Sequence, residues 1–294
     1  MDFQLTDEQR ALRSGLRALL ARRFDREALR GAVDGGGLDR GLWRALGEAG
    51  FFALRLPEED GGVGLGLPEA VLLFEEAGRA LLPGPLIATH LAAGAVEGAA
   101  EGETVVAALD GVLVEWLAEA DVVRGDAAGA EPVRSADPLT PLHRLAGEGA
   151  GGSTESALLT AAEQLGSAGR TTEMAVQHAR EREQFGQPIG AFQAVKHLCA
   201  QMLVRTEVAR AAVYAAAVTG DPVETVGAKL LADEAAVECA RDCLQVYGGM
   251  GFTWEADVHL HLKRAWVRRE RWPPTALALE LQARALEESA TGVG

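Results

Sequence analysis

The sequence predicts a mainly α-helical protein with a short β region in its middle. Ala, Leu, Glu and Arg are abundant and aromatic residues make up only 5% of the chain, which is typical of helix-rich proteins. Apolar residues recur at helical spacing early in the chain and again beyond residue 153. We therefore expect an N-terminal helical domain over 1–98, a reduced β or loop region over 99–152, and a C-terminal four-helix-bundle domain over 153–294.

Capping residues and helix breakers divide the first region into helices. Thr6 followed by Gln9 forms a capping-box pattern, and Asp39 can cap a second helix. Pro68 suits the first turn of a third helix, which a Pro-Gly-Pro run ends. The expected helices of this region cover 7–24, 40–49, 68–81 and 86–97.

The middle region changes character, and the third region returns to long helices. Residues 102–111 and 113–126 are expected to form short strands, followed by a loop rich in Gly, Ala, Asp and Pro up to Gly152. Some fifty residues are enough for a few strands but not for a large barrel. The helices expected in the third region cover 154–181, 189–219, 221–246, 256–269 and 275–289.

Charge and composition exclude several classes of protein. The chain has 28 Lys and Arg against 43 Asp and Glu, a formal net charge of −15, which argues against binding to nucleic acid. No stretch approaches the roughly 20 apolar residues of a membrane span, and the N-terminus does not resemble a signal peptide. Three cysteines suit a reducing cytoplasm, so we expect a cytoplasmic protein that binds neither nucleic acid nor membrane.

The usual metal and nucleophile motifs are missing from the sequence. Cys239 and Cys243 share a helix face, but no further ligand has suitable spacing, so they are expected to be core residues. The sequence contains no G-x-S-x-G elbow and no phosphate-binding P-loop. We therefore expect no metal site and no serine nucleophile.

Two helix breaks carry residues that could bind a ligand. Arg182 stands at the end of a helix before a Phe-Gly-Gln-Pro-Ile-Gly run, free to reach an anion, with Phe185 beside it. A second helix stops at Gly248 and Gly249, where glycine permits positive φ and the close approach of another group. The simpler alternative is that both segments are only helix-connecting turns.

These motifs resemble the acyl-CoA dehydrogenase family. The resemblance covers about 1–98 and 153–272 and rests on several motifs in the right order. In the third region they are Arg182-x-Gln184-Phe185-Gly186, Phe192-Gln193 and Gln245-x-x-Gly248-Gly249-x-Gly251. In the first region they are Gly47-Glu48-Ala49-Gly50-Phe51 and Pro57-Glu58-Glu59-Asp60-Gly61-Gly62-Val63-Gly64.

The resemblance implies an FAD enzyme that removes the α-proton of an acyl-CoA and passes a β-hydride to the flavin. In the family, the matching residues hold the pyrophosphate and adenosine half of an FAD whose ring lies mainly in a neighbouring subunit. An arginine fork suits a pyrophosphate, and exposed amides at a glycine-rich turn can add donors. The FAD contacts implied for this chain are Arg182, Gln184, Phe185, Gln193, Gln245, Gly248 and Gly249.

The sequence also departs from the family pattern. The middle β domain is about half the usual size and has no Thr-Glu-Pro-type flavin loop. At the two family positions of the glutamate base, this chain has Ser156 and the Trp272-Pro273-Pro274 run. Glu155 and Glu163 are the remaining candidates for a base in this chain.

The combination resembles a subunit with a divided role, like those of the α2β2 actinobacterial acyl-CoA dehydrogenases that degrade steroid side chains. The expected partners are a second acyl-CoA dehydrogenase subunit or another copy of the chain, an acyl-CoA substrate and an electron-transfer-flavoprotein-type acceptor. Two alternatives stay open. The chain could be a self-sufficient dehydrogenase that uses Glu155 or Glu163, or a non-catalytic helical scaffold that has lost flavin.

Overall fold

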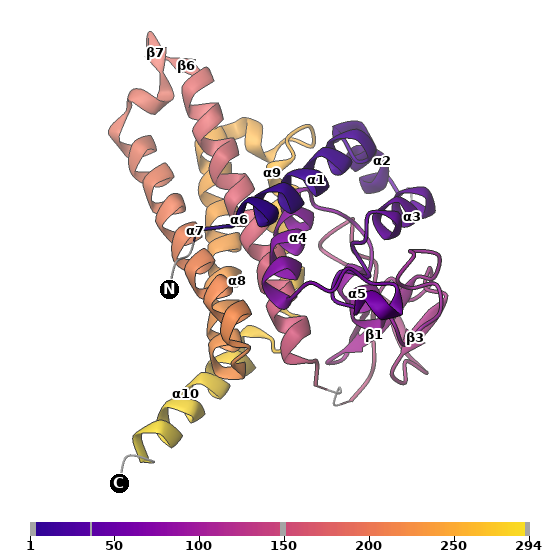
Figure 1. Cartoon of the computed structure of the whole chain (residues 1–294). Helices are drawn as coiled ribbons and strands as arrows, with labels where there is room; N and C mark the ends of the chain where they lie inside the picture. Colours follow the sequence, from indigo (N-terminus) through magenta and orange to yellow (C-terminus); the bar gives the residue numbers. More distant parts are fainter. Residues whose placement is uncertain (1–3, 36, 148–150, 292–294) are drawn as a thin grey trace.

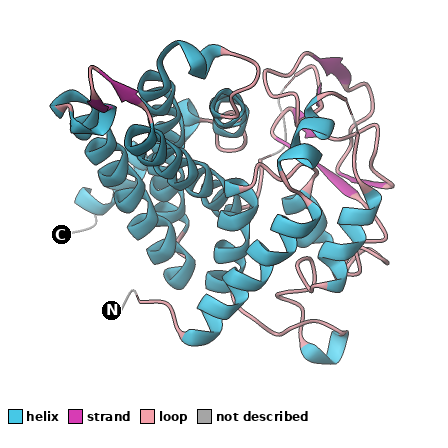
Figure 2. Ribbon diagram, turned by 90° about the horizontal axis from the view of Figure 1, so that it is seen from above, coloured by secondary structure: helices cyan, strands magenta, loops and turns pink. Residues whose placement is uncertain are grey.

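Helices of the N-terminal third pack beside a long helical bundle in the computed structural model, which describes residues 4–35, 37–147 and 151–291 (Figures 1 and 2). The predicted mainly α fold is confirmed. Among the described helices, none combines the length and apolar character needed to cross a membrane. The helices of the first third are α1 (Asp7–Arg23), α2 (Arg26–Val33), α3 (Arg40–Glu48), α4 (Leu67–Arg79) and α5 (Leu86–Ala92).

The predicted cap of α1 is confirmed, and one helix of this region was missed. The Thr6 hydroxyl accepts a hydrogen bond from the Gln9 amide at 3.1 Å, while the Gln9 side chain accepts one from the Thr6 amide at 3.0 Å. Helix α2 escaped prediction because eight residues are too few for a clear apolar period. Helix α5 ends at Ala92, earlier than predicted, as the chain turns toward Gly94 with φ +81°.

A small sheet follows, with strand order β3-β1-β2-β5-β4. Strands β1 and β3 are parallel, and the other neighbours are antiparallel. The prediction of a loop after residue 126 was wrong, because β4 and β5 lie there. Three-residue strands are too short to show an alternating pattern. Residues 148–150 of that predicted loop lie outside the described residues. The strands are β1 (Val106–Asp110), β2 (Leu113–Glu115), β3 (Val122–Arg124), β4 (Glu131–Val133) and β5 (Leu142–Arg144).

The C-terminal half is built on α6, whose bounds match the prediction. Helices α7 and α8 pack along α6, and α9 contacts both α6 and α8. Helix α10 extends away from the bundle (Figure 1). Helix α7 begins four residues later than predicted, because a hairpin and a 3-10 turn precede it. The helices are α6 (Thr154–Glu181), α7 (Gln193–Thr219), α8 (Pro222–Tyr247), α9 (Val258–Arg269) and α10 (Thr275–Thr291).

Helices α4 and α6 cross at very short range through two glycines. A Cβ atom on Gly78 would collide with the backbone of Glu163, and one on Gly166 would collide with the backbone of Glu75. Backbones can approach this closely only where both helices lack side chains at the crossing. This contact joins the N-terminal helices to the bundle.

Three arginines at helical spacing join α9 to the sheet through buried ion pairs. Arg264 pairs with Asp137. Arg268 contacts Glu115 of β2 at 2.6 Å and Glu163 of α6 at 2.7 Å. In the turn after α9, Arg271 pairs with Asp110 of β1 at 2.6 Å. All seven side chains of this arginine network are buried, so each charge depends on its partners.

Loss of one arginine should destabilise the whole fold. The Arg268→Met change leaves Glu115 and Glu163 buried with one cation fewer. We expect the free energy of unfolding, measured with urea, to fall by about 3–5 kcal/mol. The matched control is Arg284→Met on α10, whose side chain is 70% exposed and 4.0 Å from Glu280. It should change stability by less than about 0.5 kcal/mol. Equal losses in the two variants would contradict the importance of the network.

Candidate functional site

The first candidate site lies where α6 ends. Arg182 is the C-cap of α6 and leads into the hairpin of β6 (Glu183–Gln184) and β7 (Gln187–Pro188), which projects beyond the bundle (Figure 1). Its two-residue loop, Phe185-Gly186, has φ +54° and +80°, as expected for a type I′ turn. Phe185 is 92% exposed, and its ring meets that of Phe192 edge-on at 6.0 Å.

The end of α8 reaches the same end of the bundle. The Tyr247 ring stacks on that of His178, with 4.1 Å between ring centroids. Burial and the nearby charge of Arg182 lower the pKa of His178. The turn η3 (Gly248–Phe252) follows at once, with Gly248 at φ +60°. Open space surrounds the Cβ positions of Gly248 and Gly249, so a ligand could approach this backbone.

The predicted binding residues at this end are exposed and offer free donors. Within the described part of the chain, the side chains of Arg182, Gln193 and Gln245 have no hydrogen-bonding or ion-pair partner. Gln184 donates only to the Glu183 carbonyl, at 2.7 Å. An unpaired guanidinium and free amides can donate to a pyrophosphate, and an exposed aromatic ring can pack against an aromatic base. Together these groups fit a pyrophosphate joined to such a base.

The second candidate site is a pocket of about 460 Å³ at the other end of α6. Ser156 lines it and is only 8% exposed, while its amide donates to the Ser153 hydroxyl at 3.0 Å. The pocket lies between α5, β1, the segment after β3 and the start of α6. Its lining residues are Ile87, Ala88, Leu91, Ala108, Leu109, Asp110, Arg124, Gly125, Asp126, Gly151, Gly152, Ser153, Ser156 and Arg271.

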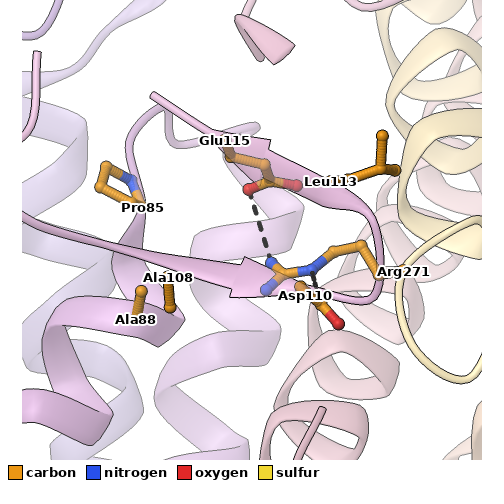
Figure 3. A pocket seen from close by; sticks show the side chains of 7 residues that line it. All are labelled: Pro85, Ala88, Ala108, Asp110, Leu113, Glu115 and Arg271. Carbon is orange, nitrogen blue, oxygen red and sulfur yellow. Dashed lines mark hydrogen bonds and ion pairs between the residues drawn. The ribbon is translucent and has the colours of Figure 1, made fainter. Parts of the chain in front are cut away.

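The buried acids near this pocket are engaged by arginine. Asp110 accepts from Arg271 at 2.6 Å and from the Trp272 amide at 3.1 Å. Figure 3 shows Arg271 reaching both Asp110 and Glu115 in the inner recess of this region. Burial alone would raise the pKa of Glu115, but the charges of Arg268 and Arg271 outweigh it and lower that pKa to about 2. The Glu115 carboxylate therefore stays ionised near neutral pH, and both acids are paired with arginine.

The two predicted base candidates, Glu155 and Glu163, do not line the pocket. Glu155 forms an ion pair with Arg55 from the N-terminal region. Glu163 is buried against Arg268. Asp126 does line the pocket, where it is exposed and accepts from the Ala128 amide at 2.9 Å. The arginine network was not predicted from the sequence, although Arg264 and Arg268, four residues apart on one face of α9, were a signal for it.

The two candidate sites are far apart. Helix α6 has 28 residues, which corresponds to a length of about 40 Å. Ser156 and Arg182 stand at its opposite ends. Within the described ranges, no cluster of His, Cys, Asp and Glu could hold a metal ion, and the predicted core residues Cys239 and Cys243 are buried.

Both helical regions match models of a known protein family. Residues 6–102 match the family described as acyl-CoA dehydrogenase, N-terminal domain, and residues 152–271 match acyl-CoA dehydrogenase, C-terminal domain. The chain is 38% identical to acyl-CoA dehydrogenase IpdE2 of Mycobacterium tuberculosis, a match covering 88% of this chain and 91% of that protein.

Two solved structures share the fold. The ChsE4-ChsE5 complex from Mycobacterium tuberculosis superposes with a TM-score of 0.84 at 23% identity, over 98% of this chain and 99% of the other. The Tcur3481-Tcur3483 steroid ACAD superposes with a TM-score of 0.83 at 22% identity, over 97% and 99%.

The depressed pKa of Glu115 predicts how acid unfolds the protein. Its ionised form stabilises the fold fully above the unfolded pKa of 4.5, and this contribution disappears as the pH falls toward about 2. The Glu115→Gln change should therefore lower the free energy of unfolding most at pH 7. The difference in this free energy between the variant and the parent should shrink by about 3 kcal/mol toward pH 2. Urea unfolding across this pH range measures it. The exposed control Glu48→Gln should leave the pH profile unchanged, and a constant Glu115→Gln deficit would contradict the prediction.

Proposed function

This chain belongs to the acyl-CoA dehydrogenase family, and we propose that it acts as one subunit of a heteromeric, FAD-dependent member of it. In this proposal the chain contributes the adenosine-side FAD site and a partner contributes the catalytic centre. FAD, when bound, supplies an acceptor for the β-hydride of the acyl-CoA. The domain division at 98 and 152, a cytoplasmic location and an electron-transfer-flavoprotein-type acceptor form part of the same proposal.

The exposed end of α6 and α8 provides the groups that would hold the cofactor. The Arg182 guanidinium binds the pyrophosphate as a two-pronged donor. Phe185 offers an exposed ring against which the adenine can pack. The amides of Gln184, Gln193 and Gln245 add further donors. The open backbone at Gly248 and Gly249 lets the cofactor come close.

The length of α6 is the observation that carries the proposal of a divided site. About 40 Å separates Arg182 from Ser156, which is longer than an extended dinucleotide. A cofactor held at Arg182 therefore presents its reactive ring to another chain rather than to the pocket of its own chain. The Arg182 cluster is then one half of a site that a partner completes.

The surroundings of Ser156 support a partner that supplies the base. A serine hydroxyl does not take an α-proton near neutral pH without an activating base of its own. Glu155 and Glu163, the carboxylates closest along the helix, are held by Arg55 and Arg268. The similarity to the ChsE4-ChsE5 complex favours a heteromeric assembly, and the similarity to the Tcur3481-Tcur3483 steroid ACAD favours a steroid substrate. In this proposal the assembly is α2β2 and the substrate is a steroid side-chain CoA thioester.

Removing Arg182 should weaken FAD binding. The Arg182→Ala change deletes hydrogen bonds to a charged group, so we expect a loss of about 1.5–3 kcal/mol in binding free energy. The measurement is flavin occupancy by visible absorbance of the assembled complex at limiting FAD. The exposed control Arg22→Ala on α1 should keep full occupancy. Unchanged occupancy in Arg182→Ala would refute this FAD site.

If a partner subunit supplies the catalytic base, the chain alone should not oxidise acyl-CoA. Activity should appear only with a partner subunit encoded beside it. In the reconstituted complex, Glu155→Gln should leave the rate of flavin reduction by an acyl-CoA within a few-fold. A fall of about 100-fold, the lower end of what a general base contributes, would make Glu155 the base and this chain the catalytic subunit. Absence of flavin from the chain and from the complex would favour the scaffold alternative.

A further inference from the structure

A second pocket, of about 200 Å³, lies between α2, α4, α6 and α9. It is separate from the pocket at Ser156 and shares no residue with the Arg182 cluster. Its volume is below the roughly 300–1,000 Å³ of sites for drug-sized ligands, so it suits a small molecule or group. The lining residues are Phe24, Asp25, Arg26, Leu29, Arg79, Ala80, Leu81, Arg170, Met174, Asp257 and His261.

The imidazole of His261 lines this pocket. The residue is only 3% exposed, and its Nδ1 lies 2.8 Å from the hydroxyl of Ser167. In the tautomer in which this hydroxyl donates to Nδ1, the ring proton stands on Nε2. Since Nδ1 faces Ser167, Nε2 is the nitrogen left to face the pocket, and it has no partner in the described chain.

Arg170 supplies a second group of free donors. Arg26 is held by Asp257 at 2.8 Å, and Arg79 by Glu173 at 2.6 Å. Arg170 approaches Glu173 only at 3.6 Å, beyond hydrogen-bonding distance, and its side chain is 40% exposed. Its guanidinium is therefore available to a ligand in the pocket.

The electrostatic environment of His261 is positive. Burial and the charges of Arg170, Arg264 and Arg79 lower the pKa of His261 to about 3, so the ring stays neutral at physiological pH. Arg26, Arg79 and Arg170 line the pocket together with Asp25 and Asp257. Asp257 is paired with Arg26 and Arg30, and Asp25 accepts from the Ala28 amide, so both carboxylates are already engaged. Among the three lining arginines, Arg170 is the one without a hydrogen-bonded carboxylate, and its charge would attract a ligand with negatively charged oxygens.

We propose that this pocket binds a small oxyanion, a carboxylate or phosphate group, through the Nε2 of His261 and the guanidinium of Arg170. The two donors come from α9 and α6, which the fold packs side by side. The apolar side chains of Phe24, Leu29 and Met174 leave room for a short hydrocarbon part. The site does not depend on the FAD proposal, because its residues are separate from those assigned to the cofactor.

Direct binding measurements test the site with two probes, inorganic phosphate and succinate. Calorimetric titration of the purified chain at constant ionic strength should give saturable binding of at least one of them. Phosphate binding alone identifies a phosphate ligand, succinate binding alone a carboxylate ligand, and binding of both the shared oxyanion chemistry. In Arg170→Gln, the dissociation constant should rise about 10- to 100-fold. The matched control Arg180→Gln, ten residues further along α6 and outside the pocket, should bind like the parent.

A spectroscopic measurement on the unaltered chain tests the site independently of whether the variants fold. The ¹⁵N resonance of His261 Nε2, assigned by its disappearance in His261→Gln, should shift on addition of the bound probe with the same dissociation constant. Three results would overturn the proposal. These are no saturable binding of either probe, equal weakening in Arg170→Gln and Arg180→Gln, and binding that leaves the His261 resonance unchanged.

Discussion

The structure depends on a row of three buried arginines that joins the last part of the bundle to the sheet. Arg264, Arg268 and Arg271 are four and three residues apart, so they project from one side of α9 and the turn after it. A buried guanidinium is costly without a carboxylate, and each of these carboxylates comes from a distant part of the chain. The small sheet, α6 and α9 must therefore assemble together.

This constraint also shapes the chemistry available at the start of α6. The ion pairs that hold the sheet in place engage Asp110 and Glu115, the buried acids closest to the Ser156 pocket. Glu163 is engaged in the same way from within α6. The carboxylates of this region therefore serve the packing of the fold, and the exposed donors gather at the other end of the helix, around Arg182.

Local signals in the sequence predicted most of the helices. The capping box of Thr6 and Gln9 and the bounds of α6 were predicted and are confirmed, because capping and apolar spacing act within a few residues. The short elements α2, β4 and β5 were missed, since each is stabilised by neighbours from elsewhere in the chain rather than by its own pattern. The FAD contacts, the role of Glu155 and the domain boundaries stay predictions.

The sequence by itself determined the helical fold class, because helix periodicity and capping depend on local backbone preferences. A few motifs in the right order also resemble those of the acyl-CoA dehydrogenase family, to which the comparisons then assigned the chain. Only the tertiary structure decided which charges meet, that Glu155 faces Arg55, and that His261 lies between Ser167 and a pocket bordered by Arg170. Those contacts join residues about one hundred positions apart in the chain, and the close packing of α4, α6 and α9 brings them together.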